Sequence, residues 1–143
     1  MKYSSNNYYK QKLKVAKLHE HISNQRKDWI HKLSTELANE YDYICVEDIN
    51  MQNMAQSLKL GKSTNDNGFG MFRVILDYKL SERGKKLIKI DKWFPSSKMC
   101  RFCGNINKEL TLADRVWTCI CGEVINRDEN AAINIMNVGL SVV

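Results

Sequence analysis

The sequence predicts an α/β fold that carries a cysteine-containing insert. Helical and strand-like apolar patterns alternate along the chain, and four of the five cysteines gather in one stretch near the C-terminus. The 143 residues suit one domain with a small insert, and 43% hydrophobic against 27% charged residues excludes a disordered chain. No apolar run approaches the roughly 20 residues that span a bilayer. The N-terminus also lacks an apolar signal core, so we expect a cytoplasmic protein without a membrane partner.

The first two predicted elements are a long helix and a short strand. Apolar residues recur at helical spacing over residues 7–40 and make one stripe. The stripe consists of Leu18, Ile22, Trp29, Leu33, Leu37 and Tyr41. Residues 43–46 form a run that is apolar on both faces, as expected of a buried parallel strand, and Cys45 within it is interpreted as a small core residue.

A polar loop and three further elements follow. Residues 52–70, rich in Gly, Ser, Asn and Asp, predict a loop. The spacing of apolar residues predicts a second helix over 71–82 that ends at Gly84, and then a second strand over 87–90. A last helix is expected over 129–138. Its inward residues are expected to be Ala131, Ala132, Ile135 and Met136.

The cysteines predict a metal site. Cys100 and Cys103 form a C-x-x-C pair, and Cys119 and Cys121 form a C-x-C pair; fifteen residues separate the two pairs, and each pair is followed by glycine. Two close pairs joined by a loop of this length are typical of a tetrahedral four-thiolate zinc site. Two disulfides would need a secretory route, and a redox pair would need no second pair nearby. With all four positions filled by protein, we expect a structural zinc ion.

The net charge of +6 is unevenly distributed. Residues 1–27 hold seven basic residues and one acidic residue, and residues 83–101 hold another seven against one. Two concentrated basic segments indicate a polyanionic partner, most simply nucleic acid, although solvated surfaces are an alternative interpretation. Lys10, Lys14 and Lys17 share one face of the long helix, where they could follow a phosphate backbone.

Acidic residues stand at two places where α/β folds put their sites. Glu47 and Asp48 follow the first strand, and Asp128 begins the last helix. Carboxylates from separate elements that meet at strand ends are how phosphodiester hydrolysis holds Mg²⁺. From the spacing alone, two alternatives stay open: Asp128 as a helix N-cap, and Glu47 with Asp48 as a solvated strand end.

An ordered set of motifs covers nearly the whole chain. They are VEDIN at 46–50, GFGMFR at 68–73, LDYK at 76–79, FPSSK at 94–98 with the first cysteine pair, and NRDENAAINI at 126–135. Together they closely resemble the C-terminal part of the TnpB/OrfB proteins of bacterial insertion sequences. Members of that family are RNA-guided DNA nucleases, ancestral to the type V CRISPR effectors.

The resemblance implies a RuvC-like, RNase H-like nuclease domain that uses three carboxylates and carries a zinc-ribbon insert. Residues 1–94 would be part of that domain, residues 95–122 the zinc ribbon, and residues 123–143 the final nuclease segment. Glu47 matches the second catalytic carboxylate and Asp128 the third, with Mg²⁺ or Mn²⁺ as their metal. The four cysteines match the zinc ligands. The residues expected to contact nucleic acid near this site are Lys98, Arg101, Arg127 and Asn130.

The sequence departs from the family at its start. A full member is much longer, and its first catalytic aspartate lies on a strand before the long helix, whereas residues 1–27 contain no aspartate. We therefore expect an incomplete fold with an exposed apolar edge at residues 43–46, and little cleavage by this chain alone.

Three interpretations follow from this departure. The chain is an inactive fragment of a transposon nuclease, a zinc-ribbon module that binds nucleic acid, or one half of a split nuclease. The expected partners are DNA, guide RNA, and either a complementing N-terminal fragment or a second copy.

Overall fold

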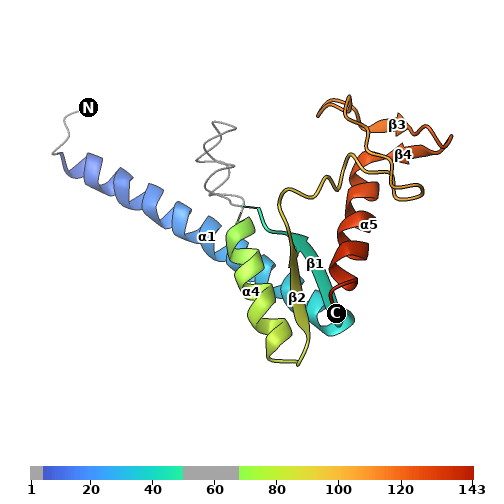
Figure 1. Cartoon of the computed structure of the whole chain (residues 1–143). Helices are drawn as coiled ribbons and strands as arrows, with labels where there is room; N and C mark the ends of the chain where they lie inside the picture. The colour runs from blue at the N-terminus through green and yellow to red at the C-terminus, as the bar shows by residue number, and fades with distance from the viewer. Residues whose placement is uncertain (1–4, 50–67) are drawn as a thin grey trace.

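A two-stranded parallel sheet lies between helices in the computed structural model, which describes residues 5–49 and 68–143 (Figure 1). The elements in chain order are α1 (Asn6–Glu40), β1 (Tyr43–Glu47), α4 (Phe69–Ser81), β2 (Lys86–Ile90), β3 (Val116–Thr118), β4 (Val124–Asn126) and α5 (Arg127–Leu140). The α/β prediction is confirmed, and so are the order and type of every predicted helix and strand. No helix in the described part of the chain is long and apolar enough to cross a membrane.

Helix α1 packs on the rest of the molecule through its C-terminal half only. Its buried residues are Ile30, Ser34 and Ala38, which recur every fourth residue and meet α4. The predicted apolar stripe is therefore only partly covered by the described residues. Leu18, Ile22, Trp29 and Tyr41 are exposed, whereas Leu33 and Leu37 are half-buried. The N-terminal half of α1 projects away from the body, and no other described residues cover its apolar side chains (Figure 1).

The sheet has a helix layer on each face. Strands β1 and β2 run parallel, with Ile44 opposite Leu87 and Cys45 opposite Ile88. Because side chains alternate across a strand, Ile44 and Leu87 pack with α1 and α4, whereas Cys45 and Ile88 face Gly139 of α5. The parallel pairing was predicted correctly. No residue of β1 is fully buried, because within the described residues β1 pairs along one edge only, in line with the exposed apolar edge expected at residues 43–46.

Helix α4 begins two residues earlier than predicted, after Gly68 in a left-handed conformation (φ +70°). Residues 52–67 of the predicted polar loop lie outside the described residues. A lysine ties α4 to α1, because Lys79 is buried and its Nζ donates to the His31 carbonyl at 2.6 Å and to Thr35 Oγ1 at 2.5 Å.

The inward face of α5 differs from the prediction. Asn130, Asn134 and Gly139 are buried. Of the residues expected there, Ala132 and Met136 are exposed, and Ala131 and Ile135 are half-buried. One reason for the different inward face is the contact of α5 with β1 at Gly139. A Cβ added at Gly139 would lie 2.9 Å from the Cβ of Cys45, so only glycine lets α5 approach β1 this closely. The asparagines instead face the backbone of the insert.

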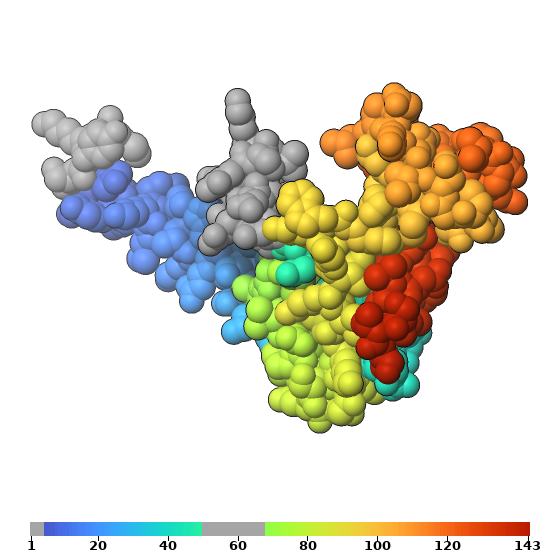
Figure 2. Space-filling model, in the orientation of Figure 1, coloured from blue at the N-terminus to red at the C-terminus, as the bar shows by residue number. Residues whose placement is uncertain are grey.

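The insert forms a separate lobe on the N-terminal end of α5 (Figure 2). Strands β3 and β4 pair antiparallel, and an isolated bridge joins Met99 to Ile106. The lobe has a small core of its own, formed by Cys100, Leu110, Trp117, Cys119 and Ile125. Two of these core residues are predicted metal ligands, so the metal site and the packing of the lobe share side chains.

Candidate functional site

Four cysteine thiols converge in the lobe. The sulfur atoms of Cys100, Cys103, Cys119 and Cys121 all lie within 4.8 Å of one another. Cys100 Sγ lies 3.8 Å from Cys121 Sγ, and Cys103 Sγ lies 3.6 Å from Cys119 Sγ, so the thiols are unbonded and each is available as a ligand. The predicted cysteines therefore come together, and the cluster could hold one metal ion.

Backbone turns present the two cysteine pairs. The N–H of Gly104 donates to the Cys100 carbonyl, and the N–H of Gly122 donates to the Cys119 carbonyl, both at 2.9 Å. Both glycines have positive φ (74° and 92°), which a side chain would oppose. Burial of the Cys100 thiol opposes its ionisation, but hydrogen bonds from backbone N–H groups, including that of Cys103, outweigh burial and lower the Cys100 pKa to about 7.

Two asparagines attach the first cysteine turn to α5. The Nδ2 groups of Asn130 and Asn134 each donate to the Met99 carbonyl at 2.7 Å, and that of Asn134 also donates to the Ser96 carbonyl at 2.8 Å. Asn130 Oδ1 accepts from the backbone N–H of Arg101 at 3.0 Å. These contacts fix the orientation of the lobe on the helix whose first turn carries Asp128.

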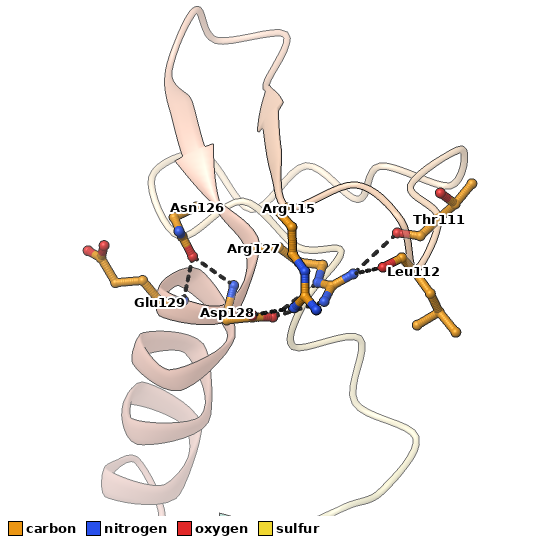
Figure 3. A network of polar contacts seen from close by, with 7 residues as sticks. All are labelled: Thr111, Leu112, Arg115, Asn126, Arg127, Asp128 and Glu129. Atoms are coloured by element: carbon orange, nitrogen blue, oxygen red, sulfur yellow. Dashed lines mark hydrogen bonds and ion pairs between the residues drawn. The ribbon is translucent and has the colours of Figure 1, made fainter. Parts of the chain in front are cut away.

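Asp128 lies in a network of two arginines (Figure 3). Arg115 Nη1 donates to Asp128 Oδ2 at 2.8 Å, and Arg127 Nε and Nη2 donate to Oδ1 at 3.1 Å. Arg127 also donates to the Leu112 carbonyl at 2.7 Å, which ties the network to the lobe. The hydrogen bonds from Arg127, reinforced by the positive charge of both arginines, hold the Asp128 pKa below its ordinary value.

The N-cap alternative for Asp128 is wrong. Asn126 caps α5, because its side-chain oxygen accepts from the N–H groups of Asp128 and Glu129, both at 3.1 Å (Figure 3). Asp128 is the second residue of the helix, and its carboxylate projects outward with 64% of the side chain exposed. The carboxylate is thus reachable from solvent, with two arginines beside it.

Glu47 and Asp48 end β1 in different surroundings. Glu47 is half-buried and accepts a 2.5 Å hydrogen bond from Ser96 Oγ, which ties the strand end to the loop that enters the lobe. Asp48 is exposed and pairs with Arg73 of α4 at 3.6 Å. The solvated-end alternative therefore describes Asp48 but not Glu47.

The described residues bring three or more possible metal ligands together only at the four cysteines. Glu47 and Asp128, predicted to share a divalent ion, are each held by other partners: Glu47 by Ser96, and Asp128 by Arg115 and Arg127.

The predicted nucleic-acid contacts fall into two groups. Lys10, Lys14 and Lys17 are exposed along the projecting half of α1. The remaining four are engaged within the protein. Lys98 donates to the Lys108 carbonyl, Arg101 pairs with Glu129 at 2.8 Å, Arg127 binds Asp128, and Asn130 is completely buried. For Asn130 the structure corrects the prediction, because a side chain with no exposed surface joins the lobe to α5 instead of meeting a ligand.

Sequence reasoning did not assign three residues that hold the site together. Ser96 and Asn134 stand within the quoted motifs, so their position beside assigned residues was the available signal. Arg115 lies outside those motifs and thirteen residues before its partner Asp128, and no local pattern predicts that pairing.

An apolar groove of about 460 Å³ lies beside Glu47, at the side of β1 that no described strand pairs with. Its walls come from β1, α4 and α5. The lining residues are Cys45, Val46, Glu47, Ile49, Phe69, Phe72, Arg73, Ala132 and Ile135. Ala132 and Ile135, which were predicted to face inward, thus border the groove instead of a closed core.

Two protein-family models match the chain. One, described as a probable transposase of the OrfB type, covers residues 1–58, and the other, described as the TNB domain of Cas12f1-like proteins, covers residues 69–135. Two relatives carry the name "Putative RNA-guided DNA endonuclease". The relative from Streptomyces pristinaespiralis is 42% identical over 137 residues, and the relative from Escherichia coli, InsQ, is 32% identical over 154 residues.

The relatives are longer than this chain. Each match covers 96% of the chain but only 34% and 38% of the relative, so the chain spans about a third of their length. A cryo-EM structure of a Cas12f1–sgRNA–target DNA complex resembles the fold, with a TM-score of 0.63 and 25% identity. That match covers 86% of this chain and 36% of the other.

Proposed function

Since the chain belongs to the TnpB/OrfB family, we propose that it is the zinc-containing, nucleic-acid-binding part of a transposon-encoded RNA-guided DNA endonuclease. DNA and guide RNA are its proposed partners, in line with the names of its relatives and with the complex that its fold resembles. Residues 1–94 and 123–143 would form part of a RuvC-like, RNase H-like domain, and residues 95–122 the zinc ribbon.

Zinc fits the four-cysteine cluster. A tetrahedral Zn²⁺ with Zn–S bonds of about 2.3 Å separates its sulfurs by about 3.8 Å. The two measured separations of 3.6 and 3.8 Å agree with this value. When bound, zinc would link the two turns and supply folding energy to a lobe with a small core. All four ligands come from protein, so the ion would have no open position for chemistry.

The carboxylates fit a divalent-ion site less well. Hydrolysis of a phosphodiester by two metal ions needs ligands on both ions, and the described residues contain no acidic group of three or more. We propose that Glu47 and Asp128 are two of three ligands, and that this chain alone does not cleave DNA.

The geometry at the start of α5 carries the proposal. The four-cysteine lobe is fixed by Asn130 and Asn134 to the helix whose first turn presents the exposed Asp128 between two arginines. The guanidinium groups beside Asp128 are suited to a phosphate backbone, since arginine binds phosphate through paired donors. The lobe would thus place bound nucleic acid next to the carboxylate.

The test is a binding and cleavage assay on the zinc-loaded chain. Single- and double-stranded DNA and RNA are incubated with the protein in Mg²⁺ or Mn²⁺, with Asp128→Ala as the matched control. We expect binding that weakens as salt rises and no cleavage. Cleavage abolished by Asp128→Ala would contradict the proposed inactivity and imply a third carboxylate from a second subunit. A chain without nucleic-acid affinity would contradict the proposed function altogether.

A second candidate, a nuclease completed by a further segment, is favoured by the groove along the unpaired side of β1. An apolar surface and an open strand edge at the end that carries Glu47 are suited to an added strand. Such a strand could also bring the missing carboxylate. The complementing N-terminal segment could come from the same polypeptide or from another one. Mixing the chain with that segment should then restore cleavage that depends on both Glu47 and Asp128.

A stand-alone zinc-ribbon module that binds nucleic acid would give a different result in these assays. If the lobe and the basic surfaces bind nucleic acid without any role for the carboxylates, affinity would survive Glu47→Ala and Asp128→Ala. It would be lost after zinc is removed, and the complementing segment would restore no cleavage.

A further inference from the structure

We propose that Trp93 is a stacking platform for an unpaired base of single-stranded nucleic acid. The inference rests on the proposed function, and it adds a binding residue and a preference for single strands. Trp93 lies in the loop between β2 and the cysteine lobe, and 80% of its surface is exposed. Burial of a large aromatic side chain is favourable, so an indole that is this exposed in a loop indicates a contact surface.

The loop presents the indole in a fixed turn. Asp91 Oδ1 accepts from the Trp93 backbone N–H at 2.9 Å, and the Asp91 carbonyl accepts from the Phe94 N–H at 3.1 Å. The Ser96 N–H then donates to the Phe94 carbonyl at 2.8 Å. Because the backbone on both sides of Trp93 is hydrogen-bonded, a base that stacks on the ring meets a surface already held in place.

A cation already lies over the ring. Lys92 Nζ lies 5.1 Å from the Trp93 ring centroid, within the range of a cation–π contact. An aromatic face next to a lysine is the combination that single-strand-binding proteins use, because the ring stacks on the base and the cation pairs with the phosphate. The exposed fraction of Trp93 leaves most of the indole open to such a base.

The residues around Trp93 are suited in charge and position to a nucleic-acid strand that reaches the end of β1. Trp93 belongs to residues 83–101, which carry seven basic residues against Asp91 alone. Lys89 and Lys92 line a hollow of about 430 Å³ together with Ile90, Asp91 and Asp48, the residue after Glu47. Three residues after Trp93, Ser96 donates to Glu47 itself. A strand stacked on Trp93 would therefore lie beside the end of β1.

The test compares oligothymidine with a blunt duplex of the same length on the zinc-loaded full chain. Loss of one stacked base costs about five- to 150-fold in affinity, so Trp93→Ala should weaken oligothymidine binding by that factor. Duplex binding should change little, since paired bases offer no free face. Trp93→Phe, which keeps an aromatic face, should recover most of the lost affinity.

Two controls separate stacking from charge and from exposed tryptophan in general. Trp29 of α1 is also exposed, at 62%, and Trp29→Ala should leave oligothymidine affinity unchanged. Lys92→Ala should reduce the slope of log affinity against log salt by about 0.7, whereas Trp93→Ala should leave that slope unchanged. A Trp29→Phe chain keeps two tryptophans, the exposed Trp93 and the buried Trp117. Oligothymidine should quench the fluorescence of Trp93 in that chain.

The outcomes distinguish this inference from the function on which it rests. If the wild-type chain binds oligothymidine and Trp93→Ala binds equally well, the platform is overturned and nucleic-acid binding stands. Equal losses of affinity for the single strand and the duplex would also overturn the platform, because they would indicate a general change in the loop. If the wild-type chain binds neither probe, both the platform and the proposed function fail.

Discussion

Asn130 joins three backbone groups of the first cysteine turn to α5 without any exposed surface of its own. Its Nδ2 donates to the carbonyls of Met99 and Ser96, and its Oδ1 accepts from the N–H of Arg101. Asn134, one helical turn later, donates to the same two carbonyls. The carbonyls therefore keep a partner if Asn130 is lost, whereas the N–H of Arg101 does not.

The first prediction follows from that difference. Asn130→Ala should lower the free energy of unfolding by about 1–3 kcal/mol, because it leaves the half-buried Arg101 N–H without its acceptor. Urea titration followed by circular dichroism measures the change. Asn137→Ala, at an exposed position of the same helix, is the control and should change the free energy by less than about 0.7 kcal/mol. Equal effects of the two substitutions would contradict a special role for Asn130.

The second prediction concerns the pKa of Asp128, which its arginine partners hold below the ordinary value. Hydrogen bonds from Arg127 are the largest cause, and Arg115 contributes less. Arg127→Ala should therefore raise the Asp128 pKa more than Arg115→Ala does, as measured by a carboxyl NMR titration. Asp114 is the internal control for Arg115→Ala, because its own pKa is lowered mainly by the Thr111 hydroxyl and N–H.

The sign of the pH dependence follows from the direction of the shift. A carboxyl whose pKa is lowered in the folded state stabilises that state above its ordinary pKa. The contribution disappears as pH falls through the lowered value. Near neutral pH the Asp128 ion pairs should thus be complete, and they should be lost only in acid. A larger rise in the Asp128 pKa with Arg115→Ala than with Arg127→Ala would contradict the assignment of causes.

At the scale of elements, the cysteine lobe depends on its ligands for its packing. Cys100 and Cys119 belong to its core together with Trp117. The strands β3 and β4 of the lobe are three residues long each. A core this small supplies little stability without a metal ion. Helix α5 begins at the end of β4 and packs on β1 and β2, so it connects the lobe to the sheet.

The third prediction is that removal of zinc exposes Trp117. A chelator should shift tryptophan fluorescence to longer wavelength, and Trp117 should account for the shift, because Trp29 and Trp93 are already exposed. Cys119→Ser should lower the zinc content measured by atomic absorption. Cys45→Ser should retain one zinc per chain, since Cys45 lies on β1, outside the cluster. Unchanged fluorescence in the chelated protein would argue against a lobe that folds around a metal ion.

At the scale of the whole molecule, the described residues leave large apolar surfaces uncovered. The groove beside β1 joins apolar side chains of three elements, and the strand edge next to it is unpaired. Along the projecting half of α1, Leu13, Leu18 and Ile22 are also exposed. Such surfaces in one small molecule favour association, because burying them removes apolar area from water.

The fourth prediction is that the chain alone self-associates. Sedimentation velocity should show a mass that rises with protein concentration, and the groove substitution Ile135→Lys should reduce that rise. Val74→Lys is the control, because Val74 is also apolar and is exposed on α4 but does not line the groove. A monomer at all concentrations, or equal effects of the two lysines, would contradict a role for the groove in association.

Local patterns in the sequence determined the elements and the cysteine site. The spacing of apolar residues predicts α1, β1, α4, β2 and α5 to within two residues at every end, because each pattern reflects local backbone geometry. The two cysteine pairs are close in sequence, and each lies in a short antiparallel turn: the first between the bridged Met99 and Ile106, the second between β3 and β4. The ordered motifs identified the family, which the comparisons confirm.

Only the tertiary structure decided which faces are buried and which charges meet. The α1 stripe and the apolar face of α5 follow helical periodicity, but a face is buried only where a partner lies opposite it, and periodicity does not supply the partner. The pairing of Arg115 with Asp128 and of Ser96 with Glu47 spans 13 and 49 residues. Contacts of that separation arise from packing, so they determine the surroundings of both carboxylates while leaving no local trace in the sequence.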